Sequence, residues 1–366
     1  MNLEADVCIV GAGPGGALLG YLLAKNNIST IVFERHEGID KEFRGEHLNQ
    51  EGEAVLRAYD LYEQVEREGL LLMKRVEYWQ HGQVFKTVTP AAGERHVGIH
   101  VPQRNLLSVL LRAAEIFPHY KLMMGTKVTG LITNENDMVT GVKAKKGNEE
   151  VSIKSSIVVG ADGRFSTVRK LAGIPFSIIK HGYDLLWAKI PAPAEWEPTI
   201  RQALVGGKQL ALFTQAGGYV QIGWNIEEGS YPDLKKQSFE PFIQQVVEAF
   251  PKLSESVHHY IQSWNDFILL NVHSSKCETW VRDGLALMGD AAHTMSPTGA
   301  FGINASLVDA RVLSEVIIEA LDQGNVGAVR LKKFEQLRRE AVEILQEQQL
   351  IKEANFKDHF AVLSGS

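Results

Sequence analysis

A glycine-rich loop near the start of the chain is the first stretch whose residue types could do chemistry. Gly11-Ala12-Gly13-Pro14-Gly15-Gly16 follows an apolar run, residues 6–10, that reads as a buried parallel strand. Gly11 permits a tight turn, Gly13 lets the backbone approach a pyrophosphate, and Gly16 allows close packing of helix on strand. Free amides at the start of the following helix would face an anion. The loop therefore predicts dinucleotide binding.

An acidic residue lies at the distance that such a loop requires. A second apolar strand, residues 30–33, ends at Glu34, which lies 21 residues after Gly13, where an acid meets the adenosine ribose hydroxyls. Arg35 could receive the 2′-phosphate of NADP, but the carboxylate of Glu34 would repel that phosphate. FAD or NAD fits better. The alternative is an ordinary βα turn, because the chain has 33 glycines.

A second pattern, Gly160-Ala161-Asp162-Gly163, follows a predicted strand over residues 151–159. The strand delivers an Asp-Gly turn, and Ser166 is placed to cap a short helix that leads to Arg169. Alone, this turn is a weak signal.

A third pattern lies far along the chain. Asp290 follows Gly289 at the end of an apolar strand, where its carboxylate can accept hydrogen bonds from ribityl or ribose hydroxyls. Beyond it, a glycine-rich segment opens a helix, and free amides there would stabilise the negative charge of a reduced flavin. The segment contains Pro297, Gly299, Gly302, Ile303 and Asn304. The alternative is a plain connection. Together the first and third patterns predict one long cofactor held at both ends, which favours FAD.

The three patterns together resemble the class A flavoprotein monooxygenases, the aromatic hydroxylases related to para-hydroxybenzoate hydroxylase. The resemblance covers most of the chain. It implies that Arg44, in Arg44-Gly45-Glu46, belongs to a flavin-contacting loop, that Arg104 meets the ribityl-phosphate portion, and that Val128 lies by the adenine. One position departs from the family pattern: Ala300 stands where relatives commonly have glycine.

The resemblance also implies an activity. The chain is expected to hydroxylate an aromatic or polycyclic small molecule with NADH or NADPH as transient electron donor and O2, through a flavin C4a-hydroperoxide. That species must be kept from water. The Asp162-Gly163 region is implicated in both flavin and pyridine-nucleotide binding.

Few side chains are candidates for direct chemistry, because the cofactor carries the reaction. His47 could face the flavin and activate a phenolic substrate, although a loop histidine is more often a surface or packing residue. His293, directly after Gly289-Asp290-Ala291-Ala292, is expected to have a structural role beside the cofactor. Trp187 and Trp224 are candidates for an aromatic pocket, with core packing as the alternative.

Besides the monooxygenase, a flavin reductase and a non-catalytic flavin-binding protein stay open. A flavin reductase of the geranylgeranyl reductase type, acting on double bonds, shares the architecture, but its Y-x-W-x-F-P element is absent. A flavin-dependent halogenase is disfavoured in the same way, since W-x-W-x-I-P is absent. A non-catalytic flavin-binding protein is the third class.

These patterns need an α/β fold to position them. We expect a Rossmann-like FAD-binding domain of the GR2 type over residues 1–73, 96–175 and 276–330. A mainly antiparallel β-sheet substrate domain is expected over residues 74–95 and 176–275, and a C-terminal helical segment over residues 331–366. Residues 49–62 are expected to be helical. The last helix is predicted to be amphipathic through Phe334, Leu337, Val342, Leu345 and Leu350.

Composition bounds the remaining possibilities. At 366 residues two domains are expected, and a net charge of −6 without a dense basic run argues against nucleic acid. Cys8 and Cys277 form no redox pair, and the absence of a signal sequence or membrane span leads us to expect a cytoplasmic protein. No metal site is predicted. A homodimer is left open.

Overall fold

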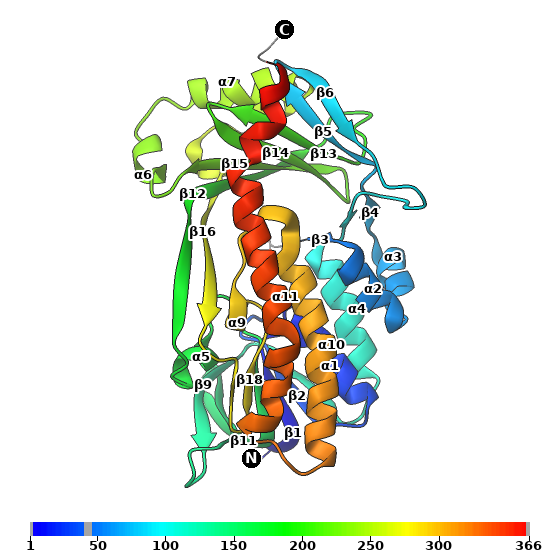
Figure 1. Cartoon of the computed structure of the whole chain (residues 1–366), viewed down its shortest axis with the longest axis vertical. Helices are drawn as coiled ribbons and strands as arrows, with labels where there is room; N and C mark the ends of the chain where they lie inside the picture. The colour runs from blue at the N-terminus through cyan, green and yellow to red at the C-terminus, as the bar shows by residue number, and fades with distance from the viewer. Residues whose placement is uncertain (1–2, 40–45, 364–366) are drawn as a thin grey trace.

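The computed structural model describes residues 3–39 and 46–363 and contains two large sheets (Figure 1). The first has a parallel centre, as the apolar runs predicted. Its main path is β17-β18-β11-β1-β2-β8, built from Val281–Arg282, Leu285–Leu287, Glu149–Gly160, Leu3–Val10, Thr30–Phe33 and Tyr120–Met123. The antiparallel strands β9 (Thr126–Thr133) and β10 (Val139–Lys146) extend it from β11.

The parallel strands of this sheet end at one level. Val10 pairs with both Gly160 and Phe33, and Gly160 pairs with Leu287. Because the carboxyl ends of parallel strands share one edge, the residues that follow them meet there. The three sequence patterns and Glu34 all follow these strands.

Helices cover this sheet. α1 (Pro14–Lys25) packs against both α4 (Gln103–Glu115) and α10 (Phe301–Asp322). Shorter helices are α2 (Gln50–Ala58), α3 (Tyr62–Glu68), α5 (Thr167–Leu171) and α9 (Asp290–His293). A small sheet joins β3 (His47–Leu48), β7 (Ile99–His100) and β4 (Leu71–Leu72) beside them.

The second sheet is mainly antiparallel; most of it forms the upper layer in Figure 1, and its strands β12 and β16 extend down the left side. Its order is β16-β12-β15-β14-β13-β5-β6, built from Ile268–Cys277, Phe176–Pro191, Tyr219–Glu227, Lys208–Gln215, Thr199–Val205, Arg75–Gln80 and Gln83–Val88. One face packs against α7 (Glu240–Ala249) and α8 (Ser254–Tyr260), with α6 (Tyr231–Leu234) nearby. Short 3-10 turns lie at Pro251–Leu253, Trp264–Asp266, Thr298–Ala300 and Phe356–Leu363.

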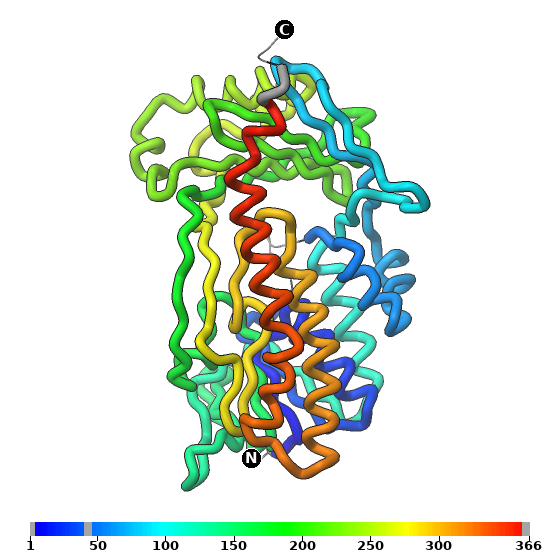
Figure 2. Tube along the Cα trace, viewed as in Figure 1, coloured from blue at the N-terminus to red at the C-terminus, as the bar shows by residue number. Residues whose placement is uncertain are grey.

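The long helix α11 (Ala328–Ala354) crosses the front of both layers, as the chain trace also shows (Figure 2). At its upper end, the rings of Phe356 and Phe360 are 5.4 Å apart, and Phe360 lies 5.5 Å from Phe85 of β6. The predicted α/β class with an antiparallel second sheet and C-terminal helices is confirmed. Within the described residues, no helix has the length and apolarity to cross a membrane.

Some local predictions were wrong. The chain breaks the helix expected over residues 49–62 at Asp60, whose φ of 59° lies in the left-handed region, so α2 and α3 are separate. The apolar stripe expected on the last helix is also only half buried. Phe334 and Val342 are buried, whereas Leu337 and Leu350 are 56% and 38% exposed.

Candidate functional site

The glycine loop has the geometry that a pyrophosphate needs. A side chain at Gly11, whose φ is +107°, would overlap the carbonyl of Ala161, and one at Gly16 would overlap the carbonyl of Gly11. At Gly13 a Cβ would meet no described atom within 4 Å, so this position faces open space. Gly13 is the N-cap of α1, and no side chain of the described residues caps that helix. These amides can therefore receive an anion.

Glu34 lies at the far side of the same loop. The residue is buried with 5% exposure, and its Oε2 accepts a hydrogen bond of 3.2 Å from the Ala12 N–H. Its Oε1 accepts from the His36 N–H at 3.0 Å. The carboxylate is therefore held at the end of β2, beside the loop.

The second pattern forms a self-contained turn. The carboxylate of Asp162 accepts hydrogen bonds from the Ser166 hydroxyl at 2.5 Å and from the Thr167 N–H at 2.6 Å. Burial raises the pKa of Asp162, and these bonds offset part of that rise. Ser166 caps α5, as predicted, by accepting from the Arg169 N–H at 3.0 Å. This carboxylate thus stabilises its own turn.

The third pattern is anchored by a buried charge cluster. Asp309 of α10 is fully buried, accepts from the Gly289 N–H at 3.0 Å, and lies 2.7 Å from His293 Nε2. Arg338 of α11 donates to its other oxygen at 2.8 Å. Burial alone would raise the pKa of Asp309, but His293 and Arg338 outweigh it and hold that pKa below its ordinary value. His293 therefore has a structural contact in this cluster, and its predicted place beside the cofactor stays a prediction.

The three patterns meet at one place. A Cβ at Gly15 would lie 2.8 Å from Met288, and the Ala161 N–H donates to Val10 O at 2.8 Å. Arg169 donates to Ala291 O at 2.8 Å, which ties the second pattern to the third. Segments that are distant in the sequence therefore surround one site.

The helix start after the third pattern has a strained backbone. Gly299 and Ala300 have φ of 76° and 54°, both in the left-handed region. Asn304 Nδ2 donates to Ala300 O at 2.8 Å and to His47 O at 3.0 Å, and its Oδ1 accepts from the Asn49 N–H. Asn304 thus fixes the loop. Ala300, at which a departure from the family pattern was predicted, is the non-glycine residue of this turn with left-handed backbone.

Asp290 lies beside this helix start. A Cβ at Gly302 would be 3.8 Å from Asp290 Oδ1. Both residues, like Ile303 and Pro297, are only partly buried, and Gly299 is exposed. A carboxylate and accessible helix amides therefore lie together, which fits the polar end of a flavin.

Other predicted contacts take different positions. Val128 is buried in β9, whose first residue, Thr126, donates its N–H to Glu34 O at 2.8 Å. Arg104 is exposed in the first turn of α4, and the exposed Arg35 donates to the His36 ring at 3.1 Å. Arg44 lies outside the described residues.

His47 lies where the second sheet approaches these loops. Its ring centroid is 5.6 Å from that of His100 and 5.5 Å from that of Phe213. Nε2 is buried, and no partner for it lies among the described residues. Burial, with a smaller effect of His100, lowers the pKa of His47 to about 3. The imidazole is therefore neutral near pH 7 and is suited to hydrogen bonding.

A buried polar network supports this histidine. His100 Nδ1 accepts from the Ala216 N–H at 3.1 Å, so Nε2 carries the proton and donates to Glu46 Oε2 at 3.1 Å. Gln215 donates to Glu46 at 3.3 Å and to Gln221 at 2.5 Å. Gln215 Oε1 has no partner among the described residues. An unused acceptor is thus available at the centre of the network.

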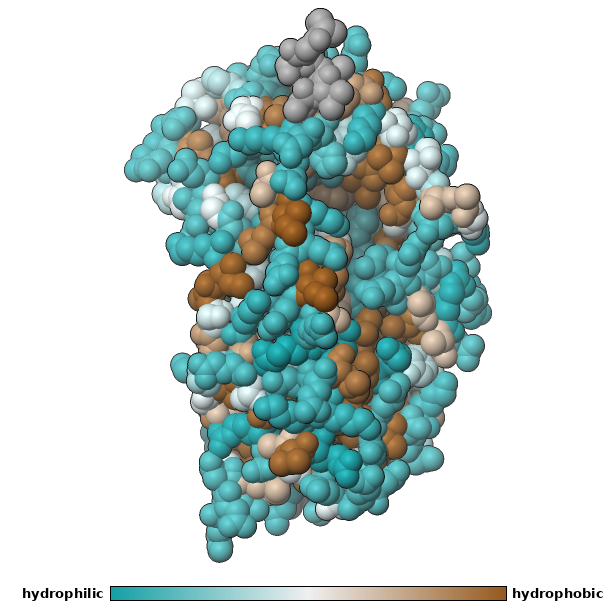
Figure 3. Space-filling view, in the orientation of Figure 1, coloured by the Kyte–Doolittle hydropathy of each residue, from teal (hydrophilic) through white to brown (hydrophobic). Residues whose placement is uncertain are grey.

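The lower face of the second sheet carries aromatic side chains. The rings of Trp187 and Phe213 are 6.0 Å apart, and Trp187 lies over Gly223, where a Cβ would be 2.8 Å from the ring. Trp224 points to the opposite face and stacks on Phe242 at 3.8 Å, so it is a core residue. In Figure 3 the surface is hollowed between the upper layer and the helices below it, with apolar side chains on the upper wall.

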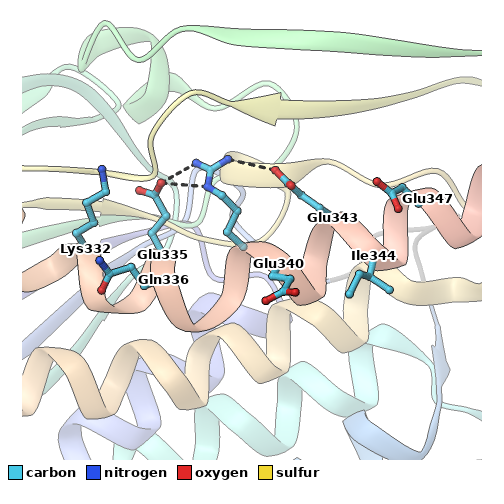
Figure 4. Close-up of a pocket in the computed structure, with 8 residues that line it drawn as sticks. Lys332, Glu335, Gln336, Glu340, Glu343, Ile344 and Glu347 are labelled. Atoms are coloured by element: carbon cyan, nitrogen blue, oxygen red, sulfur yellow. Dashed lines mark hydrogen bonds and ion pairs between the residues drawn. The ribbon is translucent and has the colours of Figure 1, made fainter.

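A separate surface depression of about 490 Å³ follows the outer side of α11 (Figure 4). Its wall is charged, and Arg339 pairs with Glu335 at 2.8 Å and with Glu343 at 3.5 Å. None of the residues that line it belongs to the three patterns. It is therefore distinct from the site described above.

The fold and the converging patterns define a flavoprotein with a second, mainly antiparallel sheet. A family model described as an FAD binding domain matches residues 4–349, and the chain belongs to that family. A 6-methylpretetramide 4-monooxygenase from Streptomyces rimosus is 35% identical over 321 residues, which cover 87% of this chain and 76% of the relative. A digeranylgeranylglycerophospholipid reductase from Methanosarcina acetivorans is 23% identical and covers 91% of this chain and 80% of the relative.

A solved structure shares the fold. PqsL, a probable FAD-dependent monooxygenase from Pseudomonas aeruginosa, matches with a TM-score of 0.83 and 19% identity, over 97% of each chain. The predicted resemblance to the flavoprotein monooxygenases is confirmed, and the chain is an FAD-dependent monooxygenase. The reductase alternative has the weaker support, because its relative is less similar in sequence.

Several residues of the site were not predicted. His100, Gln215 and Gln221 gave no signal, because single polar residues in short strands form no spacing pattern. Arg338 was not recognised, because the last helix contains many other charged residues. Glu46 was assigned to the flavin loop. Its contacts with His100 of the small sheet and Gln215 of the second sheet could not be predicted from the sequence.

Proposed function

We propose that the chain hydroxylates a polycyclic phenolic substrate bound between the flavin and the lower face of the second sheet. The support is the juxtaposition of Trp187 and Phe213 with the buried, unpartnered acceptors of His47 and Gln215. A fused aromatic system would pack on the rings, and its hydroxyls would donate to these acceptors. The name of the Streptomyces relative points to the same substrate class.

The cofactor contacts belong to this proposal. Gly11, Gly13, Gly15 and Gly16 with the start of α1 would hold the pyrophosphate, and Glu34 the adenosine ribose. Asp290 would bind ribityl hydroxyls, and the helix start would meet the pyrimidine edge. Further contacts are assigned to Arg35, Arg44, Arg104, Val128, Asp162, Pro297, Gly299, Gly302, Ile303 and Asn304. When bound, FAD supplies the redox chemistry with NAD(P)H and O2 that side chains lack.

His47 is assigned as a substrate-contacting residue. With a pKa of about 3 it is a weak base, so we infer that it orients a phenolic hydroxyl as a neutral hydrogen-bond partner. Glu46 and His100 would hold it in place, and the apolar face of the sheet would exclude water. NADH or NADPH as donor is typical of the family. The predicted division into cofactor and substrate domains is part of the same proposal.

A substrate screen tests this function. The purified holoprotein is offered simple phenols, quinolones and aromatic polyketides, and NADH or NADPH oxidation is followed together with oxygen uptake. We expect polycyclic phenols to stimulate both in parallel and to yield a hydroxylated product. Turnover that depends on added free reduced flavin would replace this single-chain scheme with a two-component one. Product that gains hydrogen without oxygen uptake would favour the reductase class.

A further inference from the structure

The buried side of α11 carries four polar residues beside the apolar Leu331, Phe334 and Val342. Glu335, Arg338, Gln346 and Gln349 are 5%, 7%, 2% and 0% exposed. They follow the spacing of one helix face. Buried amides and charges are unfavourable unless they are hydrogen-bonded. Their partners therefore indicate what this face does.

The amide side chains of α11 bind the segment between α9 and α10. Gln346 donates to Thr294 O at 3.0 Å. Gln349 accepts from the Ser296 N–H at 3.2 Å and donates to the carbonyls of Ser296 and Thr298 at 2.7 and 2.6 Å. The Gln349 amide thus pairs with both backbone groups of Ser296, as a neighbouring strand would. Residues 294–297 lie in no helix or strand, so α11 pairs the backbone of Ser296, while Thr294 is shared with Ser275 of β16.

Glu353 ties the same segment to the second sheet. Its Oε1 accepts from the Ser296 hydroxyl at 2.7 Å and from the Tyr183 hydroxyl at 3.0 Å, and its Oε2 lies 2.6 Å from His181 Nδ1. Tyr183 also lies 3.0 Å from the Thr298 hydroxyl. His181 and Tyr183 belong to β12, the strand that carries Trp187. One carboxylate therefore joins α11, β12 and the segment that leads to the flavin loop.

We propose that Gln349 and Glu353 are positioning residues for the flavin, which set the backbone of residues 296–298 and through it the helix start that meets the cofactor. The inference rests on the flavin contacts assigned above to residues 297–304. The left-handed conformations of Gly299 and Ala300 directly follow the anchored segment. A non-glycine residue keeps such a conformation only where its surroundings determine it. Gln349 holds one side of this turn and Asn304 the other.

The test compares Gln349→Leu with Gln348→Leu. Leucine keeps helix propensity and volume, and Gln348 is the exposed neighbour. FAD is titrated into each apoprotein, and the midpoint potential of the bound flavin is measured. We expect Gln349→Leu to raise the FAD dissociation constant roughly tenfold or more and to shift the potential, because three hydrogen bonds to the segment are lost. Gln348→Leu is expected to stay within about twofold of the wild type.

Two further variants separate the outcomes. Asp290→Ala reports on the flavin site itself. If Asp290→Ala weakens FAD binding while folded Gln349→Leu binds FAD with unchanged affinity and potential, the inference is overturned and the site stands. If neither variant changes FAD binding, both the assigned flavin site and the positioning role of Gln349 are contradicted. If Gln349→Leu does not fold, the isosteric Glu353→Gln decides: a changed flavin potential supports the inference, and an unchanged one overturns it.

Discussion

At the scale of single residues, His47 owes its properties to its surroundings. Burial among Phe213, His100 and Gly98 keeps the imidazole uncharged. A charged side chain at this position would need hydrating water, and a hydroxylase site must exclude water. The neutral ring can accept or donate one hydrogen bond without that cost. This residue therefore suits recognition of a phenol better than its deprotonation.

The depressed pKa of His47 predicts a pH-dependent stability. The unfolded chain takes up a proton at this residue near pH 6.5, whereas the folded protein does so only near pH 3. Between these values the unfolded state binds more protons, so stability falls as the pH falls, by up to about 1.4 kcal/mol per pH unit. His47→Phe should flatten this loss in urea unfolding of the apoprotein between pH 6.5 and pH 4.5. The exposed control His259→Phe should keep the wild-type slope; equal slopes in both variants would contradict the assignment.

Glu34 is expected to contribute directly to cofactor affinity. Glu34→Ala removes the carboxylate assigned to the ribose and should weaken FAD binding by about 1–3 kcal/mol. Fluorescence titration of the apoprotein measures the change, with the exposed Glu66→Ala as control. An affinity equal to that of the wild type would remove Glu34 from the cofactor site.

The pair formed by Arg338 and Asp309 should be important for folding. Arg338→Met removes the guanidinium that donates to the buried carboxylate of Asp309 and should cost about 3–5 kcal/mol of unfolding free energy. The control Arg330→Met breaks a half-exposed pair with Glu319 and should cost at most about 1 kcal/mol. Urea unfolding of both proteins measures these costs. Similar losses of unfolding free energy in the two variants would show that the buried pair stabilises the fold no more than the half-exposed one.

At the scale of secondary structure, prediction succeeded where a local pattern was strong. The strands that lead to Gly11, Asp162 and Asp290 are apolar runs bounded by glycine, and each was recognised. The strand over residues 199–205 was missed, because Arg201 and Gln202 interrupt its apolar residues, and Arg201 is buried through its bond to Glu77. The buried face of α11 was misassigned for the same reason. Hydropathy cannot reveal polar side chains that are buried with distant partners.

Gly223 of β15 allows a test of the proposed substrate-binding face, because the Trp187 ring lies over it. Gly223→Ala would push the Trp187 ring out of its place, since the added Cβ would lie 2.8 Å from it. We expect KM for the substrate to rise roughly tenfold while FAD affinity is unchanged. In the control Gly130→Ala the Cβ would make ordinary contacts at 3.6 Å with Lys143. Steady-state kinetics of both variants measure the effect, and an unchanged KM in Gly223→Ala would remove Trp187 from the substrate site.

At the scale of the whole molecule, function depends on segments that are brought together from most of the chain. The parallel sheet aligns the three patterns, most of the second sheet lies above them, and α11 contacts both sheets, through β17 of the first and through Glu353 to β12 of the second (Figure 1). The convergence of the three patterns could be predicted, because the carboxyl ends of parallel strands lie at one edge of the sheet. The network of Glu46, His100 and Gln215 could not, since it exists only where two sheets meet.

Oxygen labelling tests the central claim most directly. The holoprotein is supplied with NADPH or NADH, a polycyclic phenol that stimulates turnover, and isotopically labelled O2, and the product is analysed by mass spectrometry. We predict a product that carries one labelled oxygen atom for each nicotinamide oxidised. A product without the label, or one that has gained only hydrogen, would contradict the assignment of this chain as a monooxygenase.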